Sequence, residues 1–482
     1  MSLLNSFIEN VRKNPTKLAI QAERESYTYE EMSRVIEGIQ RDLKEKGYKA
    51  RDHIAIMMGN EPTFIFSLYA IWAMGATAIP INPSYTKHEI QYILEQSDAK
   101  TVLVTQQYQA LEAIVCPVEM VGLFSINNCL QDTHIHSMAD VAVILYTSGT
   151  TGHPKGAMLT HENLFENARD VAEFLGIYHD DRMITVLPVF HVFALTVAVN
   201  APLLQGATLL LQSHFSPVRI FEAANEQGAT VMAGVPTMYN FLLHTESSYE
   251  KPLGSIRLAI SGGSSLPRAV IEQFEERFQL RISEGYGLSE ASPVTCFNPL
   301  GKQKVGSIGQ SIVHVENRIV DEKGFEMPRM KIGELTVRGK NVMKGYYKMS
   351  EETANALKDG WLYTGDLAYM DEEGYVFIVD RKKDLIIVGG YNVYPREVEE
   401  VLYQHEAVLE AAVVGLNDVE YGEKVCAYIT LKEEIHPERL KMYCEGHLVE
   451  YKCPTEIRIV EQLPKNSTGK VLKRQLAEEE LR

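Results

Sequence analysis

The chain of 482 residues is too long for one ordinary hydrophobic core, so two or more domains are expected. Hydrophobic residues make up 45% of the chain and charged residues 23%, a composition that is typical of a folded globular protein and excludes extensive disorder. The formal net charge of −17 disfavours nucleic acid as a partner and stable docking on anionic lipid, because both need a positive surface.

The N-terminal segment MSLLNSFIENVRKNP lacks the apolar core of a secretory signal, and its pattern predicts an amphipathic helix. The six cysteines are scattered and form no CxxC pair, so neither a disulfide framework nor a zinc site is expected. Together these features predict a cytoplasmic protein.

Residues 62–86 carry no charge and have the strongly apolar centre FIFSLYAIWAMG. A membrane-spanning helix needs about 20 apolar residues, and Gly75 and Pro80 interrupt this segment before that length is reached. We therefore predict a buried helix followed by a strand over residues 76–81, and no transmembrane segment. Peripheral contact with a membrane stays compatible with the sequence.

Helical patterns alternate with short β-branched strands through the first half of the chain, which predicts parallel sheets covered by helices. After about residue 300, segments such as GELTVRG predict antiparallel strands in a small barrel-like subdomain. From residue 380 the sequence predicts a strand, a Gly-Gly hairpin, a second strand and a helix that begins near Pro395. The predicted fold class is α/β, with a large N-terminal domain and a small, mobile α+β C-terminal domain.

The loop YTSGTTGHPKG, residues 146–156, has the composition of a phosphate site, because glycines let backbone N–H groups approach anionic oxygens and the hydroxyls and lysine add donors. The loop does not match the GTPase-type motif G-x-x-x-x-G-K-[ST], because Gly156 follows Lys155 where the motif requires Ser or Thr. A second candidate segment, STGKVL at residues 467–472, does not match this motif either. It has Pro464 where the first glycine is required and Val471 where Ser or Thr is required. A switch-type GTPase or ATPase is therefore disfavoured, and a polar surface turn is the alternative for the loop alone.

Six segments, in order along the chain, resemble motifs of the adenylate-forming superfamily, which includes acyl-CoA synthetases and adenylation domains of peptide synthetases. They are YTSGTTGHPKG (146–156), GYGLSE (285–290), GELTVRG (333–339), YTGD (363–366), DRKKDLIIVGGYNVYPREVE (380–399) and PKNSTGK (464–470). The resemblance covers essentially the whole chain. It implies an N-terminal domain over residues 1–380, built from two α/β subdomains and a β-barrel-like part at about 300–380, and a swinging C-terminal domain over residues 381–482.

The resemblance implies an acid–thiol ligase that uses ATP and Mg²⁺ and takes coenzyme A as co-substrate. In the family, a carboxylate attacks the α-phosphate of ATP to give an acyl-adenylate and pyrophosphate, and a thiol then displaces AMP. The first step requires little covalent chemistry from the protein, so positioning and charge stabilisation would carry it.

The resemblance also implies which residues bind ATP. They are Thr147, Ser148, Gly149, Thr150, Thr151, Lys155, Gly262, Gly263, Gly285, Tyr286, Gly287, Ser289, Asp366, Arg381 and Lys470. The loop residues and Lys155 would hold the departing phosphates, Tyr286 would stack on adenine, and Asp366 with Arg381 would bind the ribose. Ser289 stands where the family usually has threonine; the hydroxyl is kept, so we expect activity to survive.

The residues implied to act in catalysis are Lys470, Thr147, Glu290 and His191. Lys470 would bridge the attacking carboxylate and the α-phosphate. Glu290 would be the metal ligand, since Mg²⁺ prefers oxygen and bridges substrate phosphates. His191 resembles the family's gating histidine near the carboxylate.

Lys383 matches the hinge about which the family's C-terminal domain rotates between the two half-reactions. The hairpin residues Gly389, Gly390 and Tyr391 match the segment that then lies beside the pantetheine tunnel. No carrier domain follows residue 470 in this sequence, so coenzyme A is the expected acceptor and a separate carrier protein the alternative. A homodimer is also compatible with the sequence.

The acyl pocket is expected at His191, Val235, Pro236 and Pro293, in segments that resemble those of fatty acyl-CoA synthetases. These segments contain no arginine for a second carboxylate, and the two tryptophans lie elsewhere, so no tryptophan limits the acid to acetate or propionate. A medium- to long-chain fatty acid is the expected substrate, and an aryl acid of the 4-coumarate, benzoate or succinylbenzoate type is the alternative. A non-catalytic relative is disfavoured, because the expected charged residues are present.

Overall fold

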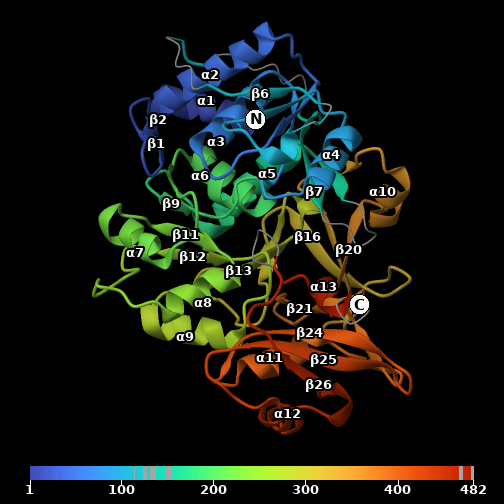
Figure 1. The fold of residues 1–482 in the computed structure, drawn as a ribbon. Helices are drawn as coiled ribbons and strands as arrows, with labels where there is room; N and C mark the ends of the chain where they lie inside the picture. The colour runs from blue at the N-terminus through green and yellow to red at the C-terminus, as the bar shows by residue number, and fades with distance from the viewer. Residues whose placement is uncertain are drawn as a thin grey trace.

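The computed structural model describes residues 1–112, 114, 116–122, 128–130, 137–147, 154–465 and 471–478. In Figure 1 the N-terminal domain fills the upper and left parts of the molecule, and the C-terminal domain lies below it. The architecture is mixed α/β with a large N-terminal part and a smaller C-terminal part, as the sequence predicts.

The first sheet is mostly parallel, with the strand order β18-β8-β7-β4-β3-β5-β6. Its strands are β3 (His53–Ile56), β4 (Thr77–Pro80), β5 (Thr101–Val104), β6 (Val118–Met120), β7 (Val141–Thr147), β8 (Lys155–Thr160) and β18 (Gly345–Tyr346). The antiparallel pairs of this sheet are β7 with β8 and β8 with β18. In chain order, α3 (Pro62–Ala73), α4 (Lys87–Gln96) and the short 3-10 helix η1 (Gln109–Leu111) lie between strands of this sheet, and α5 (His161–Leu175) follows β8. Helix α2 (Tyr29–Glu45) precedes β3 and packs on α3.

The second sheet has the order β15-β14-β13-β12-β11-β9-β10-β1-β2 and is parallel from β13 to β1. Its strands are β1 (Leu18–Gln21), β2 (Ser26–Thr28), β9 (Arg182–Thr185), β10 (Thr208–Leu211), β11 (Val231–Gly234), β12 (Leu258–Ser261), β13 (Ile282–Gly287), β14 (Val294–Phe297) and β15 (Gln310–Ser311). Its helices are α1 (Leu3–Lys13), the π-helix η2 (Ala194–Asn200), α6 (Ala201–Gln205), α7 (Pro217–Glu226), α8 (Pro236–His244) and α9 (Arg268–Phe278).

Helix α3 explains the apolar segment at residues 62–73. All twelve of its residues are buried, because α3 lies in a hydrophobic core to which both sheets contribute. The helix is followed by the buried strand β4, so the predicted helix and strand are confirmed. No helix among the described residues is long and apolar enough to span a membrane.

The third sheet is antiparallel and forms the barrel-like part. Its strands are β16 (Val315–Val320), β17 (Gly333–Gly339), β19 (Leu357–Lys358), β20 (Trp361–Met370) and β21 (Val376–Arg381), and α10 (Ser350–Ala356) precedes β19. The antiparallel strands predicted after residue 300 are therefore confirmed.

The C-terminal part is an α+β unit with its own apolar core. It contains the strands β22 (Ile386–Val388), β23 (Tyr391–Val393), β24 (Val408–Asp418), β25 (Gly422–Leu431) and β26 (Glu456–Ile459), and the helices α11 (Pro395–Tyr403), α12 (Pro437–Glu445), η4 (Glu450–Lys452) and α13 (Lys473–Glu478). The predicted hairpin joins β22 to β23. Gly389 and Gly390 have φ of +55° and +87°, a region that favours glycine at a tight turn.

Candidate active site

The predicted phosphate loop connects two adjacent strand ends of the first sheet. Thr147, the last residue of β7, pairs directly with Lys155, the first residue of β8. The loop is therefore held at both ends by one antiparallel ladder. Ser148, Gly149, Thr150 and Thr151 lie outside the described residues, as does Lys470.

The predicted metal ligand lies close to Lys155. Glu290 belongs to the short turn η3 (Ser289–Ala291), and its Oε1 accepts a 2.8 Å hydrogen bond from the hydroxyl of Tyr346 on β18. The ring of the same tyrosine lies beneath the Lys155 ammonium, which is 5.3 Å from the ring centroid. The structure thus brings Thr147, Lys155 and Glu290 together, and it adds Tyr346, which sequence reasoning missed.

The predicted ribose and adenine residues also form one cluster. The hydroxyl of Tyr286 on β13 donates to Asp366 Oδ2, and Arg381 Nε lies 3.4 Å from Asp366 Oδ1. Asp366 and Arg381 are paired residues of β20 and β21. Partial burial, followed by the Asp366 carboxylate, raises the pKa of Tyr286 well above its usual value, so the hydroxyl stays protonated as a donor.

Two glycines of the GYGLSE motif have a packing role. A Cβ on Gly285 would lie 2.1 Å from Phe297 Cδ1, and a Cβ on Gly287 would lie 2.3 Å from the Pro293 carbonyl oxygen. Such distances are not tolerated, so glycine is needed where β13 and β14 approach each other. This reason for Gly285 and Gly287 does not depend on a ligand.

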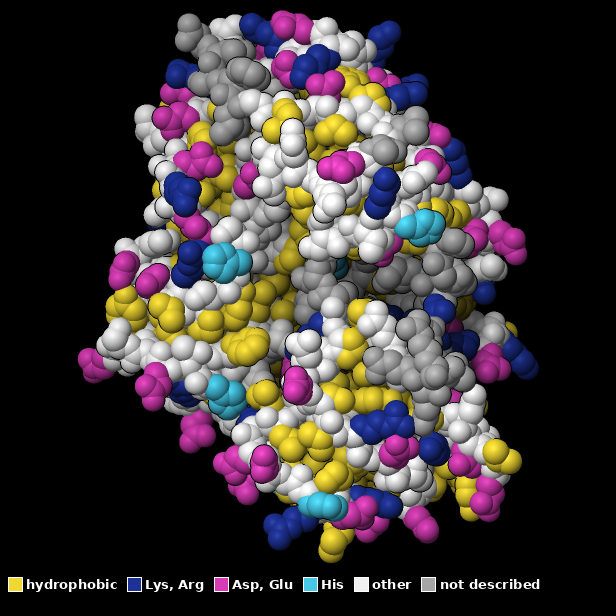
Figure 2. Space-filling model, viewed as in Figure 1, with side chains coloured by type: hydrophobic (Ala, Val, Ile, Leu, Met, Phe, Trp, Pro, Cys, Tyr) yellow, Lys and Arg dark blue, Asp and Glu magenta, His cyan; other side chains and the backbone are white. Residues whose placement is uncertain are grey.

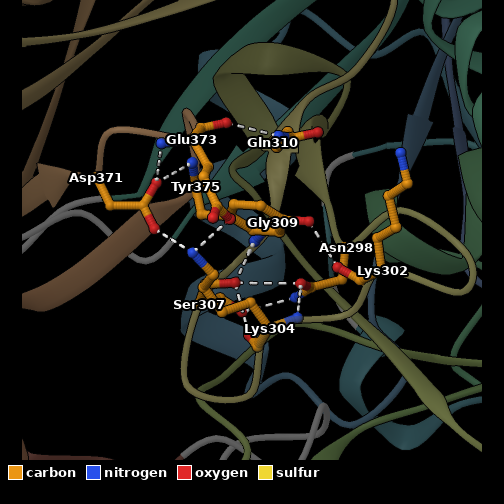
Figure 3. Close-up of polar contacts among 9 residues, drawn as sticks. All are labelled: Asn298, Lys302, Lys304, Ser307, Gly309, Gln310, Asp371, Glu373 and Tyr375. Carbon is orange, nitrogen blue, oxygen red and sulfur yellow. Dashed lines mark hydrogen bonds and ion pairs between the residues drawn. The ribbon is translucent and has the colours of Figure 1, made fainter.

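A polar network lies next to the strands that carry the predicted nucleoside-binding residues. Figure 3 shows the loop between β14 and β15 lying against the turn between β20 and β21. Lys304 Nζ lies 2.5 Å from Asp371 Oδ2 and 2.8 Å from Glu373 Oε2, and the Tyr375 hydroxyl donates to the Lys302 carbonyl at 2.6 Å. This network connects the strand that follows Tyr286 to the hairpin that carries Asp366 and Arg381.

One of the predicted acyl-pocket residues, Val235, lies beside the glycine pair that precedes α9. A Cβ on Gly262 would lie 3.1 Å from the Phe193 ring, and one on Gly263, whose φ is +85°, would lie 3.5 Å from Val235 Cγ1. Val235 is 5% exposed, Pro236 begins α8, and Pro293 is buried.

His191 is half-buried at the start of the segment that leads into η2. Its Nδ1 accepts a hydrogen bond from the Phe193 N–H at 3.3 Å. A neutral imidazole that accepts at Nδ1 carries its proton on Nε2. His191 can therefore present an Nε2–H donor.

The C-terminal domain places the start of α13 near the predicted hinge. Lys473 Nζ lies 2.7 Å from Glu399 Oε1 on α11. Burial lowers the pKa of Lys473, but Glu399, Asp380 and Asp384 outweigh this effect and raise it, so the ammonium faces the residues around the predicted hinge. Figure 2 shows that this face of the molecule is hollowed between the N-terminal and C-terminal domains.

The hairpin that is expected to meet coenzyme A lies on the protein surface. Gly389 and Gly390 are exposed, and Tyr391 is 61% exposed and stacks on Tyr451 with 4.8 Å between ring centroids. Lys383 is exposed between β21 and β22.

The described residues fit Mg²⁺ better than a metal held by protein ligands alone. They contain no cluster of three or more His, Cys, Asp or Glu side chains that could hold a metal ion. Glu290 uses Oε1 for Tyr346, which leaves Oε2 for a cation. One carboxylate oxygen suits Mg²⁺, which keeps several waters and binds substrate phosphates.

A separate surface cavity of about 520 Å³ lies on the barrel-like sheet and contains none of the predicted site residues. Two of its arginines pair with carboxylates, Arg338 with Glu316 at 2.6 Å and Arg318 with Glu326 at 3.9 Å. We therefore place the candidate site at the motif residues and not at this cavity.

Comparison with known proteins agrees with this geometry. The AMP-binding enzyme family model matches residues 7–347, and the model of the AMP-binding enzyme C-terminal domain matches residues 397–470. A long-chain-fatty-acid–CoA ligase from Bacillus subtilis is 35% identical, over 99% of this chain and 94% of the relative.

Among solved structures, ATP-bound MatB from Rhodopseudomonas palustris is 32% identical and superposes with a TM-score of 0.93 over 99% of both chains. The apo form of the same protein gives a TM-score of 0.82 over the same shares, at 31% identity. The o-succinylbenzoate coenzyme A synthetase MenE from Bacillus subtilis, in complex with ATP and magnesium ion, is 30% identical, with a TM-score of 0.87 over 98% of this chain and 99% of that chain.

Proposed function

We propose that this chain, which belongs to the AMP-binding enzyme family, uses ATP to join a medium- to long-chain fatty acid to coenzyme A. AMP-forming CoA ligase chemistry is supported by the family and by the named relatives. The fatty acid is the more specific part of this proposal, and one observation supports it: residues 193–200 and 235–243, which contain or adjoin the expected pocket residues, include no charged residue.

The first half-reaction forms the acyl-adenylate. A carboxylate oxygen attacks the α-phosphorus of ATP, the bond to the β-phosphate oxygen breaks, and pyrophosphate leaves. Lys155 and Thr147, at the paired ends of β7 and β8, are proposed to hold the departing phosphates. Tyr286, Asp366 and Arg381 are proposed to hold the nucleoside, so that the α-phosphate lies between the two clusters.

Magnesium is proposed to bind Glu290 through its second carboxylate oxygen. When bound, the cation would neutralise charge that develops on the phosphate oxygens. The MenE structure with ATP and magnesium supports this cofactor for a relative of the chain. The role of Glu290 is to orient the cation, and that of Lys155 is to supply a fixed positive charge on the same phosphates.

The C-terminal domain is proposed to supply Lys470 to the first half-reaction and then to rotate about Lys383. Two observations support the view that the described arrangement serves adenylation. The chain resembles ATP-bound MatB more closely than apo MatB, and Lys473 lies near Asp380 and Asp384 at the predicted hinge. In the second half-reaction the coenzyme A sulfur attacks the acyl carbon, the bond to AMP breaks, and the thiol proton leaves with the AMP phosphate or solvent.

Rotation would also bring Gly389, Gly390 and Tyr391 from the surface to the thiol. These residues are exposed in the described arrangement, as expected for a segment that contacts coenzyme A only after the rotation. His191, with its Nε2–H, is proposed to act near the substrate carboxylate at the mouth of the pocket.

The substrate is tested with a panel of acids assayed for ATP-dependent AMP release and thioester formation. The panel contains octanoate, palmitate, 4-coumarate, benzoate, 2-succinylbenzoate and malonate, each with coenzyme A. We expect the highest kcat/KM with the octanoate or palmitate, because an uncharged pocket wall binds an alkyl chain and leaves a second carboxylate unpaired.

A preference for one of the aryl acids would overturn the fatty-acid assignment but keep the ligase assignment. Absence of AMP release with every acid would overturn the ligase assignment itself. A parallel assay with a phosphopantetheinylated carrier protein in place of coenzyme A tests the acceptor, and faster transfer to the carrier protein would contradict the assignment of coenzyme A.

A further inference from the structure

The segment at residues 343–347 connects Glu290, which is proposed to bind Mg²⁺, with Lys155, which is proposed to bind the ATP phosphates. At one end the Met343 N–H donates to the Glu290 carbonyl at 2.8 Å. At the other end β18 pairs with β8, with Tyr346 opposite Ala157, and the Tyr347 N–H donates to the Gly156 carbonyl at 2.8 Å. The backbone of this segment therefore spans from the Glu290 turn to the strand that begins with Lys155.

The Tyr346 side chain also contacts both Glu290 and Lys155. Its hydroxyl donates to Glu290 Oε1 at 2.8 Å, and its ring lies 5.3 Å from the Lys155 ammonium. The residue is only 9% exposed, and its own N–H donates to Thr353 Oγ1 at 2.9 Å. Backbone hydrogen bonds and burial therefore fix the position of Tyr346 independently of its contacts with Glu290 and Lys155.

We propose that Tyr346 is a positioning residue that orients Glu290 for Mg²⁺ and Lys155 for the ATP phosphates. This inference rests on the proposed function, because it takes Glu290 as the metal ligand. A hydrogen bond to one carboxylate oxygen restricts the rotation of Glu290 and directs the other oxygen toward the cation; partners of this kind commonly change metal affinity by about 10- to 100-fold. The ring face stabilises the ammonium by a cation–π interaction and restricts the positions it samples.

A purely structural role for Tyr346 makes a different prediction. If the ring only filled the core, removal of the hydroxyl would leave the metal affinity unchanged. Tyr346→Phe separates the two roles, since it keeps the ring against Lys155 and deletes the one atom that contacts Glu290. Tyr347→Phe is the matched control, because the neighbouring hydroxyl contacts the carboxylate of Asp98 instead.

The test measures metal binding directly, with Mn²⁺ as the spectroscopic substitute for Mg²⁺. Free Mn²⁺ is titrated by electron paramagnetic resonance in the presence of saturating ATP for the full-length wild type and each variant. We expect Tyr346→Phe to weaken Mn²⁺ binding about 10-fold, and Tyr347→Phe to bind as the wild type does. ATP binding without metal should be unchanged in Tyr346→Phe and about threefold weaker in Tyr346→Leu, which also lacks the ring.

Kinetics give a second readout. In Tyr346→Phe, pyrophosphate exchange should fall at low Mg²⁺ and recover at saturating Mg²⁺, while thioester formation from supplied acyl-adenylate stays at the wild-type rate. Wild-type Mn²⁺ affinity in folded Tyr346→Phe would overturn the inference. The Glu290→Gln variant separates this result from a failure of the proposed function. If Glu290→Gln and Tyr346→Phe both bind Mn²⁺ as the wild type does, Glu290 is not the metal ligand. If Glu290→Gln loses Mn²⁺ binding and Tyr346→Phe keeps it, only the role proposed for Tyr346 is wrong.

Discussion

Lys473 and Glu399 form an ion pair, with 2.7 Å between Nζ and Oε1, that ties the segment after residue 470 to helix α11. Glu399 is itself held, because its Oε1 accepts a hydrogen bond from the Val413 N–H at 2.8 Å. On the other side of residues 466–470, Lys465 Nζ lies 2.6 Å from Glu410 Oε1, and Lys465 bridges to Val471. Both ends of the segment that carries Lys470 are therefore anchored on the C-terminal domain.

Lys473→Met should reduce acyl-adenylate formation by roughly 10- to 100-fold, since a small displacement of a catalytic group is costly. Thioester formation from supplied acyl-adenylate should stay close to the wild-type rate. Pyrophosphate exchange and a thioester assay measure the two steps separately. Lys452→Met is the matched control, because it removes another lysine pair to α11, Lys452–Glu397 at 2.7 Å, away from this segment. Equal losses in both variants would contradict the anchoring role.

Lys470→Ala should abolish adenylation, by about 100- to 1,000-fold, and largely spare the second half-reaction. The physical reason is that a cation between carboxylate and α-phosphate stabilises charge that develops only in the first transition state. Single-turnover measurements with ATP and acid, and separately with acyl-adenylate and coenzyme A, check the prediction. Similar loss of both steps would contradict the role assigned to Lys470.

Glu284 on β13 should make the stability of the protein depend on pH. Burial raises the pKa of Glu284 to about 7 from its usual 4.5, partly opposed by Arg396 and by the Leu266 N–H. Its Oε2 is buried without a hydrogen-bond partner among the described residues. Because the folded state keeps a proton that the unfolded state loses, stability falls as the pH rises from 4.5 to about 7 and is flat above that.

Glu284→Gln mimics the protonated carboxyl and should remove this dependence. At about pH 8 the variant should be more stable than the wild type by roughly 3 kcal/mol, since each pKa unit corresponds to about 1.4 kcal/mol. Urea unfolding at about pH 5 and about pH 8 measures the difference. The exposed Glu276→Gln on α9 is the control and should behave as the wild type. Parallel pH profiles for wild type and Glu284→Gln would contradict the assignment.

Gly285→Ala should destabilise the protein even without ATP. The new Cβ would overlap Phe297, so β13 and β14 must separate, at a cost of about 1–3 kcal/mol for overpacking. Thermal unfolding of the nucleotide-free protein measures this. Gly59→Ala is the control, because a Cβ there meets nothing within 4 Å. If Gly285→Ala lost ATP binding with unchanged stability, the glycine would act on the nucleotide and not on the strand packing.

Much of the fold and the nucleoside cluster could be predicted, because the evidence lies in short, continuous segments. Tyr286, Asp366 and Arg381 each lie in a motif of a few residues, and the buried helix α3 follows from one uninterrupted apolar run. The π-helix η2 could not be predicted, since an apolar run alone does not distinguish one helical period from another.

Tyr346 and Glu284 could not be predicted for a different reason. Tyr346 lies 56 residues after Glu290 and meets it only because β18 pairs with β8. The surroundings of Glu284 include Arg396 and Glu400 of α11, which come from another domain. In both cases the property of the side chain is set by contacts between distant segments, and no local pattern records them.

The proposed site draws on three sheets: Lys155 belongs to the first, Tyr286 to the second, and Asp366 to the third. One ATP bound as proposed would contact all three, so its binding energy would oppose their separation. A ligand at 100 times its Kd stabilises a folded protein by about 2.7 kcal/mol. We therefore expect the rate at which proteases degrade the protein to rise when the ATP concentration falls, because the ATP-free protein would be less stable than the ATP-bound protein.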